Sequence, residues 1–214
     1  MSRMRRVARL SAILALWPGA APAAEVTPGT YHYRVEHQLY GNIGEHHLRV
    51  QREGDELIVE QWATIAVKLW IFTAHRRESH YREVWRDDRL IAFDGLTVDN
   101  GEAAELTARA AGDTLLIDGS AGRIGAPAET APSLPSHQGA AVRGVFMDFR
   151  TGALLEAKVT PAGTERIEIA GRPVEARKYV VGGELEQTVW YDATGVWAQW
   201  QLARGGGTVT LTRE

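Results

Sequence analysis

The sequence predicts an all-β protein, an antiparallel meander curved into a half-barrel or open barrel, with one short helix and a long loop packed against it. Apolar and polar residues alternate along runs such as "YHYRVEHQL" at 31–39, which is the period of a half-buried strand. Turn signals rich in Gly, Asp and Asn separate these runs, among them "REGDE", "TVDNGE", "AAGDT" and "DATG". No alternation of strands with helices accompanies them, so we expect no parallel sheet.

Two neighbouring segments depart from the alternation. Residues 118–138 are rich in Gly, Pro and Ala, which predicts a long surface loop. Residues 139–149 carry apolar side chains at the spacing of one helical face, and we expect a short helix there that covers the sheet: Val142, Val145, Phe146 and Phe149. The loop as a linker between two domains is the alternative. Neither half has enough strands to look complete, so residues 24–214 are predicted to form one domain.

Residues 1–23 have the three regions of a secretory signal peptide. Arginines precede the apolar run "LSAILALW", and small residues follow at an Ala-x-Ala cleavage site. The run is shorter than the roughly 20 residues of a membrane span, which disfavours the alternative of an anchor helix. We expect cleavage after Ala23, or else after Ala24, and a mature protein in the periplasm or outside the cell.

Cleavage would make the chain more acidic. The net charge of −3 becomes −7 once four arginines are removed, Arg3, Arg5, Arg6 and Arg9. An acidic protein is poorly suited to bind nucleic acid or an anionic membrane surface. No other long apolar stretch predicts a transmembrane segment. The chain contains no cysteine, so an exported form depends on its packed core rather than on disulfides.

Three tryptophans lie close together in "VWYDATGVWAQW" at 189–200. The order Asp-Ala-Thr-Gly favours a hairpin loop with Gly195 in the left-handed conformation, which sets Tyr191 opposite Trp197. Trp197 and Trp200 are an odd number of residues apart, so a regular strand places them on opposite faces. We expect Trp200 to share the core face with Trp190, and Trp197 to be the more accessible ring.

The segment "AVKLWIF" at 66–72 is apolar on both faces of a strand, because Val67 and Trp70 point in opposite directions. Such a strand is covered on both faces, or one face lines a cavity. Simple core packing is the alternative for all of these aromatic side chains.

Histidines are the best candidates for functional side chains. Pairing across "GNIG" at 41–44 sets His37 opposite Leu48 and His46 opposite Leu39, so both imidazoles face inward. Inward imidazoles can bind a ligand's acidic group or a metal, or they are buried side chains with ordinary hydrogen-bond partners. No third ligand has a suitable spacing, so we predict no metal site.

Charge is concentrated in "AHRRESHYREVW" at 74–85, which is either a solvated strand face or the polar mouth of a cavity. At such a mouth Arg77 or His75 would hold a carboxylate or a phosphate. Glu83 and Trp85 share a face of a regular strand. The candidate ligand-binding residues are therefore two histidines, one arginine and three tryptophans: His37, His46, Arg77, Trp70, Trp85 and Trp197.

No motif predicts catalysis or a cofactor. "DGSAG" around Ser120 lacks the first Gly of a nucleophile elbow and does not precede a helix. "RGGGTVT" opens into a strand, which a phosphate-binding P-loop does not do, and His-Glu-x-x-His is absent. We predict no catalytic residue, although a β-sheet enzyme can assemble its site without local motifs.

Three stretches, "EVWRDDRL" at 83–90, "TVDNG" at 97–101 and "WYDATG" at 190–195, resemble an uncharacterised family of secreted bacterial proteins. Asp88 stands where the resemblance leads us to expect Gly, and Ser136-His137 where it leads us to expect Ser and an aromatic residue. The architecture is also similar to the half-barrel of periplasmic lipoprotein carriers. That similarity implies a hydrophobic cavity, and no known activity comes with the family.

Together these observations favour a non-catalytic periplasmic module that binds an apolar or amphipathic ligand, such as a lipid or an acyl chain. The alternatives are a hydrolase that uses His37 or His46 as its base, and an envelope protein that binds a partner through an exposed aromatic patch. A deep apolar pocket would favour the first, a cleft with convergent polar groups the second, and a closed core the third.

Overall fold

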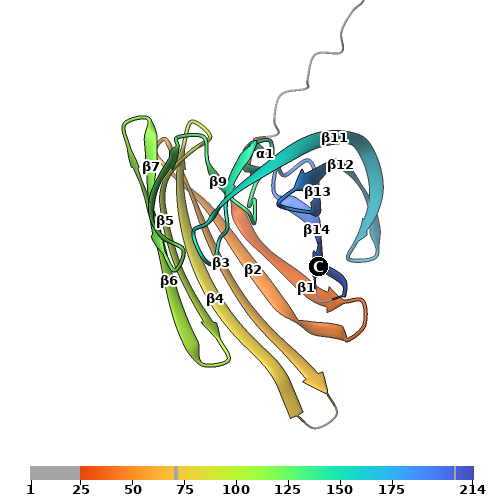
Figure 1. Ribbon diagram of the computed structural model, residues 1–214. Coiled ribbons are helices and arrows are strands. Elements are labelled where there is room, and N and C mark those ends of the chain that lie inside the picture. The colour runs from red at the N-terminus through yellow and green to blue at the C-terminus, as the bar shows by residue number, and fades with distance from the viewer. Residues whose placement is uncertain (1–24, 70–71, 205) are drawn as a thin grey trace, which may run out of the picture.

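The structure, a computed structural model, describes residues 25–69, 72–204 and 206–214. The predicted signal peptide, residues 1–23, lies outside them. Within the described residues, one sheet of 15 strands curves around a central space without closing into a barrel (Figure 1). None of the helices in this part of the chain is long and apolar enough to cross a membrane.

The first half of the chain is an antiparallel meander in which each strand pairs with the next. Its strands are β1 (Gly29–His37), β2 (Gly41–Glu53), β3 (Glu56–Leu69), β4 (Phe72–Arg86), β5 (Arg89–Asp99), β6 (Glu102–Ala111), β7 (Thr114–Gly119) and β8 (Gly122–Pro127). The predicted alternation is visible in β1, where Tyr33, Val35 and His37 are buried. Period-two patterning therefore sets which side chains face the concave side.

The second half returns along the other flank. Its elements are β9 (Ala131–Pro132), α1 (Gln138–Ala141), β10 (Val145–Met147), β11 (Leu154–Ile169), β12 (Arg172–Gly183), β13 (Gln187–Tyr191), β14 (Trp197–Arg204) and β15 (Gly207–Arg213). Strand β15 pairs with β1, so the two halves form one continuous sheet. The all-β, antiparallel, half-open prediction is confirmed, with a single parallel pair, β9 and β10, among the described strands.

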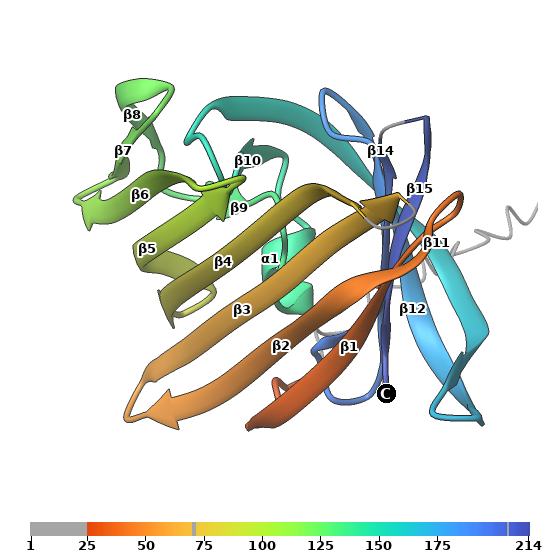
Figure 2. The same cartoon turned by 90° about the horizontal axis from the view of Figure 1, so that it is seen from below.

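The edge strands of the sheet are β8 and β9. The turn between β7 and β8 contacts the connection between β10 and β11, where the N–H of Ala121 donates a 2.9 Å hydrogen bond to the carbonyl oxygen of Thr151. Helix α1 and the short strands β9 and β10 lie inside the curve of the sheet (Figure 2). The helix is buried over all four of its residues, as expected for an element that covers the concave side.

The predicted loop and helix have different boundaries in the structure. Residues 118–138 are not one loop, because they contain β8 and β9. The helix predicted at 139–149 is a single turn at Gln138–Ala141. Val142 is 53% exposed, while Phe146 is buried in β10 and pairs with Leu155 of β11. Gly144 disfavours a longer helix, and β11 supplies the backbone partners that continue the segment as a strand.

The tryptophan hairpin has the predicted register at its turn and an unexpected bulge beyond it. Tyr191 pairs with Trp197, as Gly195 predicted, but the next pair is Trp190 with Gln199. Ala198 is therefore an extra residue, and this β-bulge turns Trp197 and Trp200 into the same core. The prediction that they face opposite sides is wrong, and Trp197, 0% exposed, is more deeply buried than Trp200 at 6%.

Trp190 also differs from the prediction. It belongs to a second apolar cluster, with Ile167, Ile169 and Ala198, and not to the face of Trp200. Its indole donates a 3.0 Å hydrogen bond to Glu165.

The hairpin between β1 and β2 turns earlier than predicted. The turn occupies residues 38–40, so "GNIG" lies within β2, and His46 pairs with Tyr33 rather than with Leu39. The bulge between the pairs of Val35 and Glu36 makes Ile43 of β2 the extra residue, whereas regular alternation along β1 keeps His37 on the buried face with Val35. Gly44 is required at its position, since a Cβ there would lie 2.0 Å from the Thr64 carbonyl oxygen.

Candidate ligand-binding cavity

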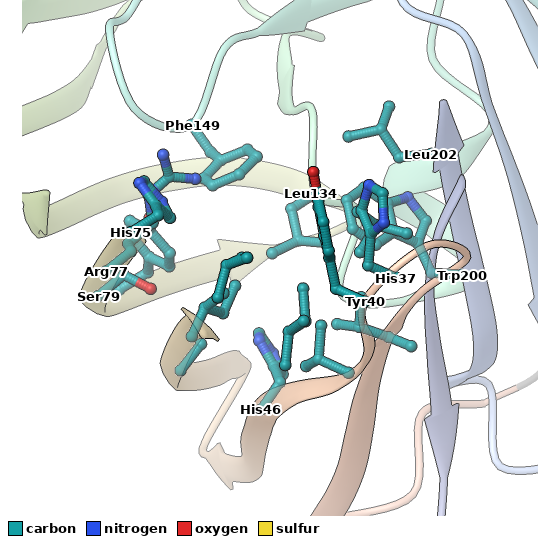
Figure 3. A pocket seen from close by; sticks show the side chains of 18 residues that line it. His37, Tyr40, His46, His75, Arg77, Ser79, Leu134, Phe149, Trp200 and Leu202 are labelled. Atoms are coloured by element: carbon teal, nitrogen blue, oxygen red, sulfur yellow. The ribbon is translucent and has the colours of Figure 1, made fainter. Parts of the chain in front are cut away.

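A cavity of about 390 Å³ lies on the concave side of the sheet (Figure 3). Six adjacent strands, β14, β15 and β1 to β4, supply most of its walls, and Leu134 and Phe149 cover it from the segment inside the curve. Figure 3 shows His75, Arg77 and Ser79 on one side and Trp200, Leu202 and His37 facing them. The cavity therefore forms between strands that are far apart in the sequence.

Its inner part is buried and mainly apolar. Val35, Ile43, Tyr81, Trp200 and Leu211 line it and are each less than a tenth exposed. Alternation along β3 adds Ala63, Ile65 and Val67 from one face of that strand. Aliphatic and aromatic walls of this kind favour an apolar ligand, because contact with it removes apolar surface from water.

The outer part of the cavity is polar. Arg77 donates from Nε and Nη2 to Asp99, and His75 Nδ1 lies 3.4 Å from the same carboxylate. On the opposite side His37 stacks on Tyr40, with ring centroids 4.7 Å apart. The cavity therefore has a charged rim and a mainly apolar interior.

His46 is the polar side chain of the inner wall. Its Nε2 donates to Oε1 of Gln61 over 3.2 Å, and its ring lies against Trp197. Burial lowers the pKa of His46 to about 3, so the imidazole is neutral at ordinary pH. A neutral imidazole places no charge beside an apolar ligand, and a side chain of this pKa is a weak general base.

A chain of buried polar groups continues from Gln61 across the core. Gln61 Nε2 donates to Glu83 Oε1 over 2.6 Å, and Glu83 Oε2 accepts from Trp85 Nε1 at 2.8 Å and from Ser136 Oγ at 2.7 Å. Burial raises the pKa of Glu83 from 4.5 to about 7, although its three hydrogen bonds act in the opposite direction. This carboxyl therefore titrates close to neutral pH.

The structure brings three of the six candidate residues to the cavity, since His37, His46 and Arg77 all line it. Trp197 is buried in the layer behind His46, where it stacks on Tyr33 with ring centroids 3.8 Å apart. Trp85 is also buried, and it contacts Glu83 rather than the cavity. Trp70 lies outside the described residues.

Sequence reasoning missed Trp200 as a wall of the cavity and Gln61 and Ser136 as members of the polar chain. One signal was available for Gln61 and for Glu83. Each occupies an inward position in a strand whose neighbouring inward positions are apolar, Val59 beside Gln61 and Tyr81 beside Glu83. A polar residue at such a position needs a buried partner.

A family model described as a domain of unknown function, DUF6134, matches residues 33–214. The chain belongs to this family. The match confirms the membership of an uncharacterised family that the short stretches at 83–90, 97–101 and 190–195 indicated. The residues that match the DUF6134 domain run from Tyr33 in β1 to Glu214, so they include every residue that lines the cavity.

The DUF6134 domain is also similar to a solved structure, the crystal structure of a beta-barrel-like protein of the domain of unknown function DUF1849 from Brucella abortus. The TM-score is 0.64 at 8% sequence identity, with 90% of this chain and 98% of that chain covered. At this identity the similarity shows the fold alone. No curated protein matches the chain.

Proposed function

We propose that the protein is an exported periplasmic binding module that holds one apolar or amphipathic ligand, such as a fatty acid or another acyl chain, in the cavity on the concave side of its sheet. The observation that carries this proposal is the cavity itself, about 390 Å³ with a buried apolar interior and a charged rim. Cavities that bind small molecules have volumes of about 300–1,000 Å³ and combine apolar walls with a few polar groups.

The polar rim of the cavity supports the proposal that the ligand has an anionic head group. Asp99 accepts two hydrogen bonds from Arg77, one from Nε and one from Nη2. A guanidinium has five N–H donors in all. The remaining donors suit a carboxylate or phosphate oxygen at the mouth of the cavity. The apolar tail would then extend inward past Val67 and Ile65 toward Trp200.

The exposed side chains of the turn between β1 and β2 support the proposal that the ligand enters the cavity from an apolar phase. Leu39 is 63% exposed and Tyr40 is 46% exposed, and Tyr40 also lines the cavity. Large apolar side chains exposed at a cavity mouth provide a surface for a ligand that leaves a membrane or a carrier. Export to the periplasm rests on the signal-peptide pattern of residues 1–23.

The test is isothermal titration calorimetry with dodecanoate at several temperatures. We expect one site and a negative heat-capacity change, because the ligand buries apolar surface. Ala63→Phe fills the cavity and is expected to abolish binding. Ala66→Phe is the matched control, since it lies on the same strand but on the other face, outside the cavity.

Arg77→Gln separates the two parts of the proposed ligand. It should weaken the binding of dodecanoate and leave the binding of dodecanol almost unchanged, because only the first has a charge for Arg77 to meet. Folded protein that does not bind dodecanoate or dodecanol, or an Ala63→Phe variant that binds dodecanoate as tightly as the unsubstituted protein, would overturn the proposal.

A further inference from the structure

A second, smaller pocket lies where the turn between β4 and β5 meets α1, with a volume of about 270 Å³. Four acidic residues line it, Glu25, Asp55, Asp87 and Asp88, and its one basic lining residue is Arg52. Asp87 and Asp88 both have positive φ, 50° and 57°, so the backbone of this turn is held in a conformation that few residues other than Gly adopt. Asp55 is paired with Arg86 Nε at 3.1 Å, and the remaining excess of acidic over basic lining side chains favours a cation over an anion in this pocket.

His137 closes the inner side of this pocket. It is 1% exposed, and its ring packs edge-on against Trp85 with centroids 4.6 Å apart. Burial lowers the pKa of His137 to about 3, so the ring is neutral and carries one N–H. Which nitrogen carries it decides what the pocket can bind.

The buried polar chain fixes that choice. Ionised Glu83 is an acceptor only, so the hydroxyl hydrogen of Ser136 is donated to Glu83 Oε2. The 3.1 Å contact between Ser136 Oγ and His137 Nδ1 then requires Nδ1 to be the donor. The Nε2 atom is left with a lone pair and no hydrogen.

This Nε2 has no hydrogen-bond partner among the described residues. The nearest carboxylate oxygen, Oδ1 of Asp88, is itself an acceptor and lies 3.9 Å away, too far for a direct hydrogen bond. Two acceptors, one buried and one charged, thus lie side by side. An unsatisfied buried acceptor is costly, and a donor group between the two would satisfy both.

We propose that this pocket is a binding site for a primary ammonium group, which donates one N–H to His137 Nε2 and another to Asp88 Oδ1. The positive charge matches the acidic lining, and the apolar side chains of Leu57 and Trp85 provide contact for the carbon next to the nitrogen. A metal ion fits less well, since the described residues offer no group of three His, Cys, Asp or Glu side chains placed to hold one.

Two sources can supply this ammonium group. One is a free amine. The other is the chain itself, because Glu25 and Val26 line the pocket and Glu25 directly follows the predicted cleavage region at Ala23 and Ala24. Cleavage after Ala24 would leave an α-amino group on Glu25, which lines the pocket.

Nuclear magnetic resonance of ¹⁵N-histidine-labelled protein at pH 8, where Glu83 is ionised, tests the site through the Nε2 resonance of His137. The probe is butylammonium, and tetramethylammonium, which has no N–H, is its control. We expect butylammonium alone to shift this resonance, and Asp88→Asn to weaken its binding about tenfold or more through loss of a charge-assisted hydrogen bond. Asp113→Asn, in the exposed turn between β6 and β7, should have no effect.

Two forms of the chain distinguish the sources: the processed protein after export, and a chain that begins with Met followed by residues 20–214. If the chain's own amino group fills the site, only the extended form binds butylammonium, and the processed form already shows the shifted resonance. If the ligand is a free amine, both forms bind it. The proposal is overturned if the Nε2 resonance is the same in the two forms and butylammonium shifts it in neither. A water molecule that alone bridges the two acceptors would give this result.

Discussion

The buried carboxyl of Glu83 should make the free energy of unfolding depend on pH in a way that Glu83→Gln removes. Burial raises the pKa of this group in the folded protein from 4.5 to about 7. Between these pH values the folded state keeps a proton that the unfolded state releases. The stability associated with Glu83 is therefore fully present below about pH 4.5 and is lost as the pH rises through 7.

The size of this effect follows from the interval between the two pKa values. Each pH unit between the two pKa values is worth about 1.4 kcal/mol, so the interval from 4.5 to about 7 corresponds to a total loss of about 3.5 kcal/mol. His46 and His137 act in the opposite direction, because burial lowers both pKa values to about 3 and stability is lost as the pH falls below 6.5. Both histidines are present in the variant and in the unsubstituted protein. Their contributions therefore cancel when the free energies of unfolding of the two proteins are subtracted.

Urea denaturation at pH 5, 6, 7 and 8 measures that difference. The glutamine variant should start less stable at pH 5, since an amide accepts fewer hydrogen bonds than Glu83 receives, and should gain about 2.5 kcal/mol relative to the unsubstituted protein between pH 5 and pH 8. Glu129→Gln, on an exposed loop, gives the baseline for replacing a surface carboxyl. A difference that stays constant from pH 5 to pH 8 would refute the reasoning.

Three further predictions, on four substitutions, test the packing. Phe146→Ala should cost about 3–5 kcal/mol, because the ring is fully buried inside the curve of the sheet, and a melting temperature that hardly moves would contradict this. Trp197→Ala should destabilise more than Trp200→Ala, since only Trp200 borders the cavity; the reverse order in paired denaturation curves would argue against the bulge at Ala198. Gly44→Ala should disrupt the pairing of β2 with β3 through its clash with Thr64, seen as faster amide exchange in both strands; unchanged exchange would contradict it.

The sequence predicted those parts of the fold that depend on local rules. Alternation defined the strands, and the positive φ of Gly195 set Tyr191 opposite Trp197. The bulge at Ala198 could not be predicted this way, because a single extra residue leaves no mark in an alternating pattern and reverses the direction of every side chain after it. The same limit applies to the turn between β1 and β2, where Gly41 marks the end of the turn and not its centre.

The candidate site was predictable only in part, for a related reason. His37, His46 and Arg77 stand out as inward polar residues on strands with clear alternation. The polar chain depends instead on contacts between distant segments, since Gln61 and Glu83 are 22 residues apart and Ser136 and Glu83 are 53 apart. Only the register of β3 against β4, and the path of the segment that carries α1, bring these groups together.

Native mass spectrometry of the protein purified from its own host tests the central claim most directly, namely that the cavity between β4 and the β14–β15 pair holds an apolar or amphipathic ligand. The account predicts one bound small molecule per chain with an acyl or comparable apolar part. That molecule should be absent from the Ala63→Phe variant and retained by Ala66→Phe. Protein that carries only its polypeptide mass, or an Ala63→Phe variant that retains the same molecule, would contradict it.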